Sequence, residues 1–224
     1  MKKFALIVAG GEGRRMGNSL PKQFLNLLGE PILMHTIRVF HQFDQEVKII
    51  VALPEDQITM WKELCQHADF TIAHQLVAGG RTRFHSVKNG LEAIHEEGIV
   101  FIHDGVRPLV SNETIGRCLA ATGEHSNAIP VVPVTESLRE VVSGKSQTVD
   151  RSNVFIVQTP QTFQVSIIKN AYRQEYDPRF TDDASVLEQA GYPVHTVEGN
   201  FENIKITRPV DLLMAETLTR YSEK

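Results

Sequence analysis

Hydrophobic runs of strand length alternate with segments of helical spacing along most of this chain. Continuous apolar runs occur at 4–9, 47–54 and 99–104, and a more mixed run occurs at 70–77. Between and after these runs, apolar residues recur every three or four positions, which is typical of helices that cover a buried sheet. These predicted helices span 31–43, 55–68, 82–97 and 111–125. The alternation predicts βαβ units and a mostly parallel central sheet, and therefore an α/β fold.

The regular alternation stops after Val134. A strand is predicted at 128–134 although the run contains two prolines, and the segment 137–151 has two short β-like runs around Ser143, Gly144 and Lys145. That pattern indicates a hairpin that leaves the sheet as an arm. The arm has two interpretations: it contacts a two-fold-related partner, or it decorates the sheet edge of its own subunit.

The C-terminal third returns to the α/β pattern. Helices are predicted near 165–175 and 182–190, strands around 194–198 and 203–207, and a final helix from Pro209. No linker, repeat or low-complexity stretch interrupts the sequence. We therefore expect a single domain over 1–224, with a β-arm at about 135–152.

The composition argues against several classes of protein but does not indicate a particular function. The 224 residues carry a net charge of −4, which gives no broad electrostatic footprint for nucleic acid. No apolar run approaches the roughly 20 residues of a membrane span, and the run Phe4–Ala9 is too short for a signal peptide. Cys65 and Cys118 lie far apart and have no zinc spacing, so we expect reduced thiols. A cytoplasmic protein that binds neither nucleic acid nor membrane is expected.

The stretch VAGGEGRRMG at 8–17 is the first candidate for chemistry. It is not a dinucleotide fingerprint, because position 16 is Met where a third glycine is needed, and it lacks the Lys-Ser/Thr pair of a P-loop. What remains is a glycine turn, with Gly11 and Gly13, whose free amides can cradle a triphosphate. Three cations accompany it: Arg14, Arg15 and, in PKQF, Lys22.

Cations near a phosphate loop can neutralise the charge that develops when a phosphorus–oxygen bond breaks. The combination fits attack on the α-phosphate of a nucleotide, with pyrophosphate as the leaving group. The alternative is that these cations are merely solvated, and we expect Arg14 to be structural or solvated. Ligands of parallel sheets bind at the carboxyl ends of the strands, which here are Ala9–Gly17, the segment after Val77, and His103–Pro108.

Other polar residues sit at such positions. In HDGVRP, Asp104 could hold Mg²⁺, bond a substrate hydroxyl or cap a turn, Arg107 could bind a phosphate, and His103 is expected to be structural. In GGRTRFHS, a second glycine turn precedes a helix. Arg151 lies at the root of the arm. Lys205 alternates with apolar neighbours, a pattern that by itself favours a solvent-facing side chain.

Taken together, the motifs resemble one family. The strings AGGEGRRMG…PKQF, GGRTRFHSV, HDGVRP, TVDR…QTPQTF, TDDAS and VEGNFENIKITRPVDL fall in the order and spacing of the 2-C-methyl-D-erythritol 4-phosphate cytidylyltransferases, over almost the whole chain. The resemblance implies a Rossmann-like nucleotidyltransferase fold and a homodimer joined by the arm. It also implies Mg²⁺-dependent transfer of CMP from CTP to 2-C-methyl-D-erythritol 4-phosphate, in the non-mevalonate route to isoprenoids.

The resemblance also implies roles for individual residues. Arg15 and Lys22 would stabilise the pentacoordinate transition state, while Lys205 and a partner subunit's copy of Arg151 would position the acceptor. Residues matching positions that contact CTP are Ala9, Gly10, Gly80, Arg83 and Ser86. Residues matching positions near the acceptor are Asp104, Gly105, Arg107, Ser137, Thr159 and Thr181.

Some positions depart from the pattern of the family. Arg81 stands where some relatives carry an acidic residue, HDGVRP replaces the commoner HDAARP, Ser137 replaces a threonine, and TDDAS replaces TDEAS. Ribitol 5-phosphate cytidylyltransferases share the first loop and PKQF and are the main alternative, although the tail of the sequence favours the methylerythritol enzymes. A non-catalytic nucleotide-binding regulator and another sugar-phosphate nucleotidyltransferase are the remaining hypotheses.

Overall fold

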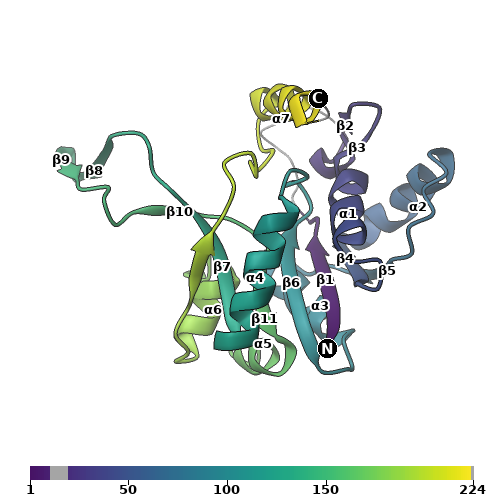
Figure 1. Ribbon diagram of the computed structural model, residues 1–224, viewed down its shortest axis with the longest axis horizontal. Coiled ribbons are helices and arrows are strands. Elements are labelled where there is room, and N and C mark those ends of the chain that lie inside the picture. Colours follow the sequence, from purple (N-terminus) through teal and green to yellow (C-terminus); the bar gives the residue numbers. More distant parts are fainter. Residues whose placement is uncertain (11–19, 223–224) are drawn as a thin grey trace.

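The computed structural model describes residues 1–10 and 20–222. Within them, eight strands form one sheet in the order β10-β7-β11-β6-β1-β4-β5, with β12 also paired to β7 (Figure 1). The strand bounds are β1 Lys2–Val8, β4 Lys48–Leu53, β5 Gln75–Ala78, β6 Gly98–Asp104, β7 Asn127–Pro133, β10 Phe155–Val157, β11 Gln161–Gln164 and β12 Thr196–Glu198. The predicted α/β fold with a mostly parallel sheet is confirmed.

The parallel centre of the sheet consists of the apolar runs that the sequence pattern predicted. β1 pairs in parallel with β4 on one side and with β6 on the other, and β4 pairs in parallel with β5. Every residue of β6 is buried, as expected for a strand covered on both faces. The register places Val8 opposite Asp104, so the ends of β1 and β6 reach the same edge of the sheet.

Helices cover both faces, giving three layers. One face packs against α3 Arg83–Glu92, α5 Val165–Ala171 and α6 Asp183–Gln189, and the other packs against α1 Ile32–Phe43, α2 Ile58–His67 and α4 Asn112–His125. Alternate residues of β1 serve the two layers: Leu6 faces α3, and Ile7 faces α1. The C-terminal helix α7, Pro209–Ser222, lies across the end of the sheet where the short strands β2 Asn26–Leu27 and β3 Glu30–Pro31 are found (Figure 1).

Three local predictions were wrong in extent. The strand predicted at 70–77 begins only at Gln75, because Trp61 Nε1 donates to His74 Nε2 at 2.9 Å and Phe70 packs beside Trp61, which holds residues 70–74 onto α2. The helix predicted to 97 ends at Glu92, before the turn that leads into β6. Pro31 belongs to β3 and precedes α1 instead of standing in its first turn.

The predicted strand at 203–207 is absent. Towards the neighbouring loop it makes one backbone–backbone bond, from Ile206 N to Val106 O at 2.9 Å, and no strand ladder forms beside it. The alternation in sequence still has a structural cause, because Ile206 is buried while Lys205 points the other way. The strands β10 and β11, which flank the cis Thr159–Pro160 bond, were not anticipated.

The predicted hairpin is confirmed as β8 Leu138–Val142 and β9 Lys145–Val149. Its turn uses Ser143 and Gly144, both with positive φ, as a tight two-residue hairpin turn requires. Figure 1 shows this hairpin projecting well away from the sheet and its helices. Residues 141–148 are all exposed. None of the helices in residues 1–10 and 20–222 combines the length and apolar character needed to cross a bilayer.

Candidate functional site

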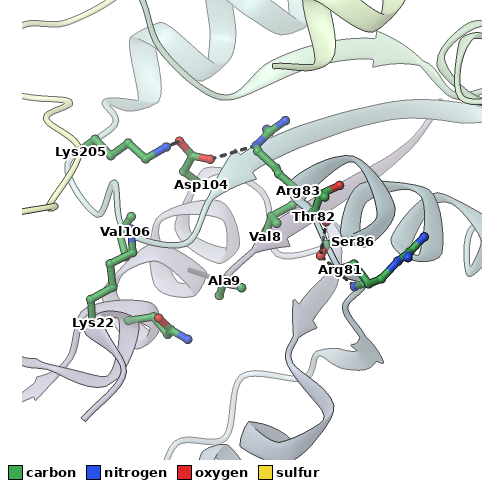
Figure 2. Close-up of a pocket in the computed structure, with 13 residues that line it drawn as sticks. Val8, Ala9, Lys22, Arg81, Thr82, Arg83, Ser86, Asp104, Val106 and Lys205 are labelled. Atoms are coloured by element: carbon green, nitrogen blue, oxygen red, sulfur yellow. Dashed lines mark hydrogen bonds and ion pairs between the residues drawn. The ribbon is translucent and has the colours of Figure 1, made fainter. Parts of the chain in front are cut away.

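A pocket of about 260 Å³ opens at the carboxyl ends of the central strands. This is the edge at which ligands of parallel α/β sheets bind. Figure 2 shows Lys22 and Lys205 on one side of the pocket, with Ser86 and Arg81 on the other. The lining within the described residues is Val8, Ala9, Gly10, Lys22, Gln23, Gly80, Arg81, Thr82, Arg83, Ser86, Asp104, Val106 and Lys205. The structure therefore gathers eight of the residues predicted from sequence around one cavity.

Asp104, the last residue of β6, is the electrostatic centre of the pocket. Its Oδ2 lies 2.8 Å from Lys205 Nζ and 3.5 Å from Arg107 Nε, and its Oδ1 lies 3.4 Å from Arg83 Nε. Burial alone would raise the pKa of Asp104, but the charges of Arg83, Lys205 and Arg107 hold that pKa well below its ordinary range. Asp104 is therefore ionised and contacts three cationic side chains.

A buried chain of hydrogen bonds fixes the backbone at Asp104. The Asp104 N–H donates to Thr159 Oγ1 at 3.1 Å, and that hydroxyl lies 3.0 Å from His103 Nδ1. His103 Nε2 lies 3.0 Å from the Arg107 carbonyl, which can only accept. This arrangement assigns the proton to Nε2 and leaves Nδ1 to accept from Thr159. Burial lowers the pKa of His103 to about 4, so the ring is neutral and structural, as predicted.

Arg83 begins α3 and reaches across the pocket edge. Its Nη1 and Nη2 donate to the two oxygens of Asp183 at 2.8 and 2.6 Å. Asp183 is fully buried and also accepts from the Tyr172 hydroxyl at 2.6 Å. The sequence indicated only that Asp182 and Asp183 start a helix; Asp182 does cap α6, accepting from Ser185 N at 2.9 Å. The contact between Asp183 and Arg83, 100 residues apart, was missed.

The second glycine turn is tied to the start of α3. Ser86 Oγ accepts from Gly80 N at 3.0 Å and donates to Thr82 O at 3.1 Å, while the Thr82 side chain caps the helix. A Cβ on Gly80 would lie 2.3 Å from the Cβ of His85, so only glycine fits without a shift of the turn. The turn therefore presents backbone to the pocket wall at a fixed position.

Lys22 enters the pocket from the short helix η2, Lys22–Phe24. The next two residues anchor it: buried Gln23 donates from Nε2 to Gln57 Oε1 at 2.6 Å, and Phe24 stacks on Trp61 with ring centroids 5.7 Å apart. Sequence reasoning passed over Gln23, although it stands beside a candidate catalytic lysine.

Other predicted residues lie outside the pocket lining. Gly105 and Thr159 are buried behind Asp104, and Arg107 is buried with its Nη1 2.6 Å from Asn203 O. Ser137, Arg151 and Thr181 are exposed, and Arg151 donates to Thr135 O at the root of the hairpin. Predictions that fall outside the described residues concern Gly11, Gly13, Arg14 and Arg15.

The pocket offers few ligands for a metal held by protein alone. No group of three or more His, Cys, Asp and Glu side chains able to hold a metal ion occurs in the part of the chain that the structure describes. Asp104 is the only carboxylate among the described lining residues, and both its oxygens face cations. The pocket is therefore suited to binding anions, and its one carboxylate lies among the cations.

Comparison with known proteins identifies the family of this chain. The profile of IspD, 2-C-methyl-D-erythritol 4-phosphate cytidylyltransferase, matches residues 4–221. The chain belongs to this family. A 2-C-methyl-D-erythritol 4-phosphate cytidylyltransferase of Bacteroides fragilis is 52% identical over 218 residues, covering 97% of this chain and 100% of the relative. The protein of the same name from Porphyromonas gingivalis is 49% identical, with 97% of each chain covered.

Solved structures of the IspD family have the same fold. The 2-C-methyl-D-erythritol 4-phosphate cytidylyltransferase of Thermus thermophilus is similar with a TM-score of 0.80 at 32% identity, covering 98% of this chain and 100% of that one. The enzyme of the same name from Francisella tularensis gives a TM-score of 0.79 at 31% identity, with 97% and 99% covered. The family resemblance drawn from the motifs is confirmed, and the ribitol alternative receives no support from these relatives.

Proposed function

We propose that this chain transfers CMP from CTP to 2-C-methyl-D-erythritol 4-phosphate and releases pyrophosphate, a step in isoprenoid biosynthesis, at the pocket described above. Membership of the IspD family over residues 4–221 assigns the reaction. The observation that supports its location is the placement of Lys22, Lys205, Arg83 and Asp104 around one pocket at the carboxyl edge of the sheet. Such a cationic pocket suits two phosphorylated substrates that must be brought together.

The reaction requires positioning and charge neutralisation more than acid–base chemistry. A phosphate oxygen of the acceptor attacks the α-phosphorus of CTP, and the bond between that phosphorus and the bridging oxygen to the β-phosphate breaks. The bridging oxygen leaves with pyrophosphate. The nucleophile is already an anion, so no general base is needed and no covalent enzyme intermediate forms. Cations that contact the reacting phosphates lower the barrier, because negative charge accumulates there in the transition state.

The described residues divide between the two substrates. Ala9, Gly10, Gly80 and Ser86 line one part of the pocket and present mainly backbone and a hydroxyl, which suits the nucleotide. Lys22, on a rigidly anchored turn, is suited to the α-phosphate. Asp104 and Lys205 can bond a hydroxyl and a phosphate of the acceptor. Arg15 is proposed to act beside Lys22, and it lies outside the described residues.

A Mg²⁺ ion is proposed as cofactor, carried into the pocket by the triphosphate. Mg²⁺ in nucleotide sites uses one or two carboxylates plus substrate phosphates and keeps several waters. Both oxygens of Asp104, the single carboxylate among the described lining residues, already face cations, so the phosphates of CTP and water would supply most of the ligands. Bound Mg²⁺ would neutralise charge on the triphosphate, while Lys22 and Lys205 hold the phosphates in place.

A homodimer joined by the arm is also proposed, with the partner's Arg151 completing the acceptor site. The hairpin exposes Val141 and Val142 at 65% and 60%, and β10 exposes Phe155, Ile156 and Val157 at 50%, 49% and 40%. Large apolar side chains exposed on neighbouring residues in this way support a protein interface. We place the enzyme in the cytoplasm, where its nucleotide substrate is made.

A matrix of substrates tests the proposed reaction. CTP, UTP and ATP are each combined with 2-C-methyl-D-erythritol 4-phosphate and with ribitol 5-phosphate, with and without Mg²⁺, and pyrophosphate release is followed. The proposal expects rapid release with CTP and methylerythritol phosphate in the presence of Mg²⁺. Faster turnover of ribitol phosphate, or of another nucleotide, would assign a different transferase. Absence of release with every pair would favour a nucleotide-binding regulator.

A further inference from the structure

Arg83 is held between two carboxylates on different elements. Its Nη1 and Nη2 form a fork with Asp183 at 2.8 and 2.6 Å, and its Nε faces Asp104 Oδ1 at 3.4 Å. All three guanidinium nitrogens therefore contact carboxylates, so we assign Arg83 to positioning instead of the CTP contact that the family resemblance implies. The fork is the short, geometrically specific contact, whereas the contact with Asp104 is long. Asp183 thus determines where the guanidinium stands, and Asp104 takes the remaining nitrogen.

Asp183 is fixed from behind as firmly as it fixes Arg83. Its side chain is 0% exposed and its Oδ1 accepts from the Tyr172 hydroxyl at 2.6 Å. The Tyr172 ring stacks on Phe84 with centroids 4.7 Å apart, so the hydroxyl has little freedom to turn away. A chain of contacts runs from Tyr172 through Asp183 and Arg83 to the pocket carboxylate.

We propose that Asp183 and Tyr172 are positioning residues that set the acceptor side of the pocket through Arg83 and Asp104. This inference rests on the proposed function. Lys205 approaches Asp104 at Oδ2, and Arg83 holds the other oxygen, Oδ1. Movement of the guanidinium would let the carboxylate rotate, and Lys205 would move with it. The turn at Gly80, which is proposed to face the nucleotide, is held by Ser86 and takes no part in this series of contacts.

A positioning role and a purely structural role have different kinetic consequences. A buried ion pair that only supported the fold would, when weakened, lower stability and change the amount of active enzyme. Weakening a positioning contact changes the affinity for one substrate selectively. The series of contacts from Tyr172 to Asp104 ends on the carboxylate that is proposed to bind the acceptor. Weakening the series should therefore change the acceptor KM.

Two variants differ in severity. Tyr172→Phe removes the hydroxyl that Asp183 accepts from and keeps the ring stacked on Phe84. Asp183→Asn keeps the shape but removes the charge opposite buried Arg83, and this variant can fail to fold. Asp183→Glu restores the charge with a longer side chain and serves as the conservative replacement. Ile168→Val, in the helix that leads to Tyr172, makes a core side chain smaller but removes no side-chain contact between Tyr172 and Asp104. It serves as the control for stability alone.

The experiment measures kcat and both KM values by pyrophosphate release, together with thermal unfolding, for the wild type and these variants. We expect the acceptor KM to rise about 3- to 10-fold in Tyr172→Phe, and by at least about 10-fold in Asp183→Asn if that protein folds, with the CTP KM within about 2-fold. Asp183→Glu should recover part of the loss, and Ile168→Val should change only the melting temperature.

The outcomes distinguish failure of the proposed function from failure of the positioning role. If the wild type does not turn over CTP with methylerythritol phosphate, the proposed function fails, irrespective of the variants. If the wild type is active but Tyr172→Phe leaves both KM values unchanged, raises both equally, or resembles Ile168→Val, the positioning role is overturned while the function stands. Tyr172→Phe alone carries the decision if Asp183→Asn does not fold.

Discussion

Lys205 Nζ lies 2.8 Å from Asp104 Oδ2, which links the extended segment before α7 to the carboxyl end of β6. The Lys205 side chain is 40% exposed and Asp104 is almost fully buried, so the ammonium stands at the pocket mouth above a fixed anion. A phosphorylated acceptor can displace or share this contact. The ion pair therefore links the charge of the pocket to the binding of substrate.

Replacing Lys205 by Met should weaken acceptor binding and leave the fold intact. A charged hydrogen bond contributes about 1.5–3 kcal/mol, so the acceptor KM should rise at least about 10-fold. Asp104 keeps Arg83 and Arg107 and stays ionised. The loss of a half-exposed pair should change the free energy of unfolding by less than about 1 kcal/mol. Steady-state kinetics and urea unfolding measure both. An unchanged acceptor KM would remove Lys205 from the site.

Replacing Lys22 by Ala should lower kcat by about 10²-fold or more, as is typical when one donor to a transition-state oxyanion is lost. The KM values should change much less, because the contact is strongest in the transition state. Lys62→Ala, on the exposed side of α2, removes the same charge away from the pocket and should behave as wild type. Turnover by Lys22→Ala close to that of Lys62→Ala would refute the assignment.

The sequence could predict the sheet and its edge because the information is local. The apolar runs that became β1, β4 and β6 are continuous, and a parallel sheet places their carboxyl ends together. Ala9, Gly10, Gly80 and Asp104 could therefore be assigned to one site without knowledge of any long-range contact. The same reasoning identified the hairpin, because its turn chemistry is contained in two residues, Ser143 and Gly144.

What could not be predicted depends on contacts between distant segments. Lys205 had the sequence pattern of a solvent-facing lysine, and only the fold places Asp104 beside it. Asp183 looked like a residue of a helix start, because nothing within its neighbourhood in sequence indicates burial opposite Arg83. Arg107 was a candidate for binding phosphate, and the fold buries it with Nη1 bonded to Asn203 O. The roles of these side chains in catalysis stay predictions.

The neutral state of His103 should appear in the pH dependence of stability. Burial lowers its pKa to about 4, against about 6.5 in an unfolded chain. Between these values the unfolded chain binds a proton that the folded chain does not, so stability falls as the pH decreases from 6.5 towards 4. The loss amounts to about 3 kcal/mol. Urea unfolding over this range should show a shallower pH slope in His103→Gln, and equal slopes would argue against a neutral buried ring.

Gly80→Ala should impair CTP binding selectively. The new Cβ would lie 2.3 Å from the Cβ of His85, so the turn must shift, and the bond from Gly80 N to Ser86 Oγ would be strained or lost. We expect the KM for CTP to rise about 10-fold, on the scale of a lost hydrogen bond plus local strain, with the acceptor KM little changed. Gly116→Ala in α4 meets no atom within 4 Å and should stabilise the helix slightly. Equal CTP KM values in both variants would contradict a nucleotide role for this turn.

Mixing two inactive variants should restore activity if the arm completes a partner's site. Arg151 and Lys22 lie on separate parts of the chain: Arg151 is exposed at the root of the hairpin, and Lys22 lines the pocket. In a heterodimer of Arg151→Ala and Lys22→Ala subunits, one site carries both substitutions and the other site carries neither. With free exchange, half of the dimers are mixed, so about a quarter of wild-type activity should return.

The measurement needs proof that subunits exchange. Differently tagged variants are mixed, the mixed species is isolated through both tags, and pyrophosphate release is compared with that of each parent. The isolated heterodimer should reach about half of the wild-type rate, because one of its two sites is intact. An isolated heterodimer as inactive as its parents would show that Arg151 acts within its own subunit or does not act at all. A protein that remains monomeric throughout would refute the dimer directly.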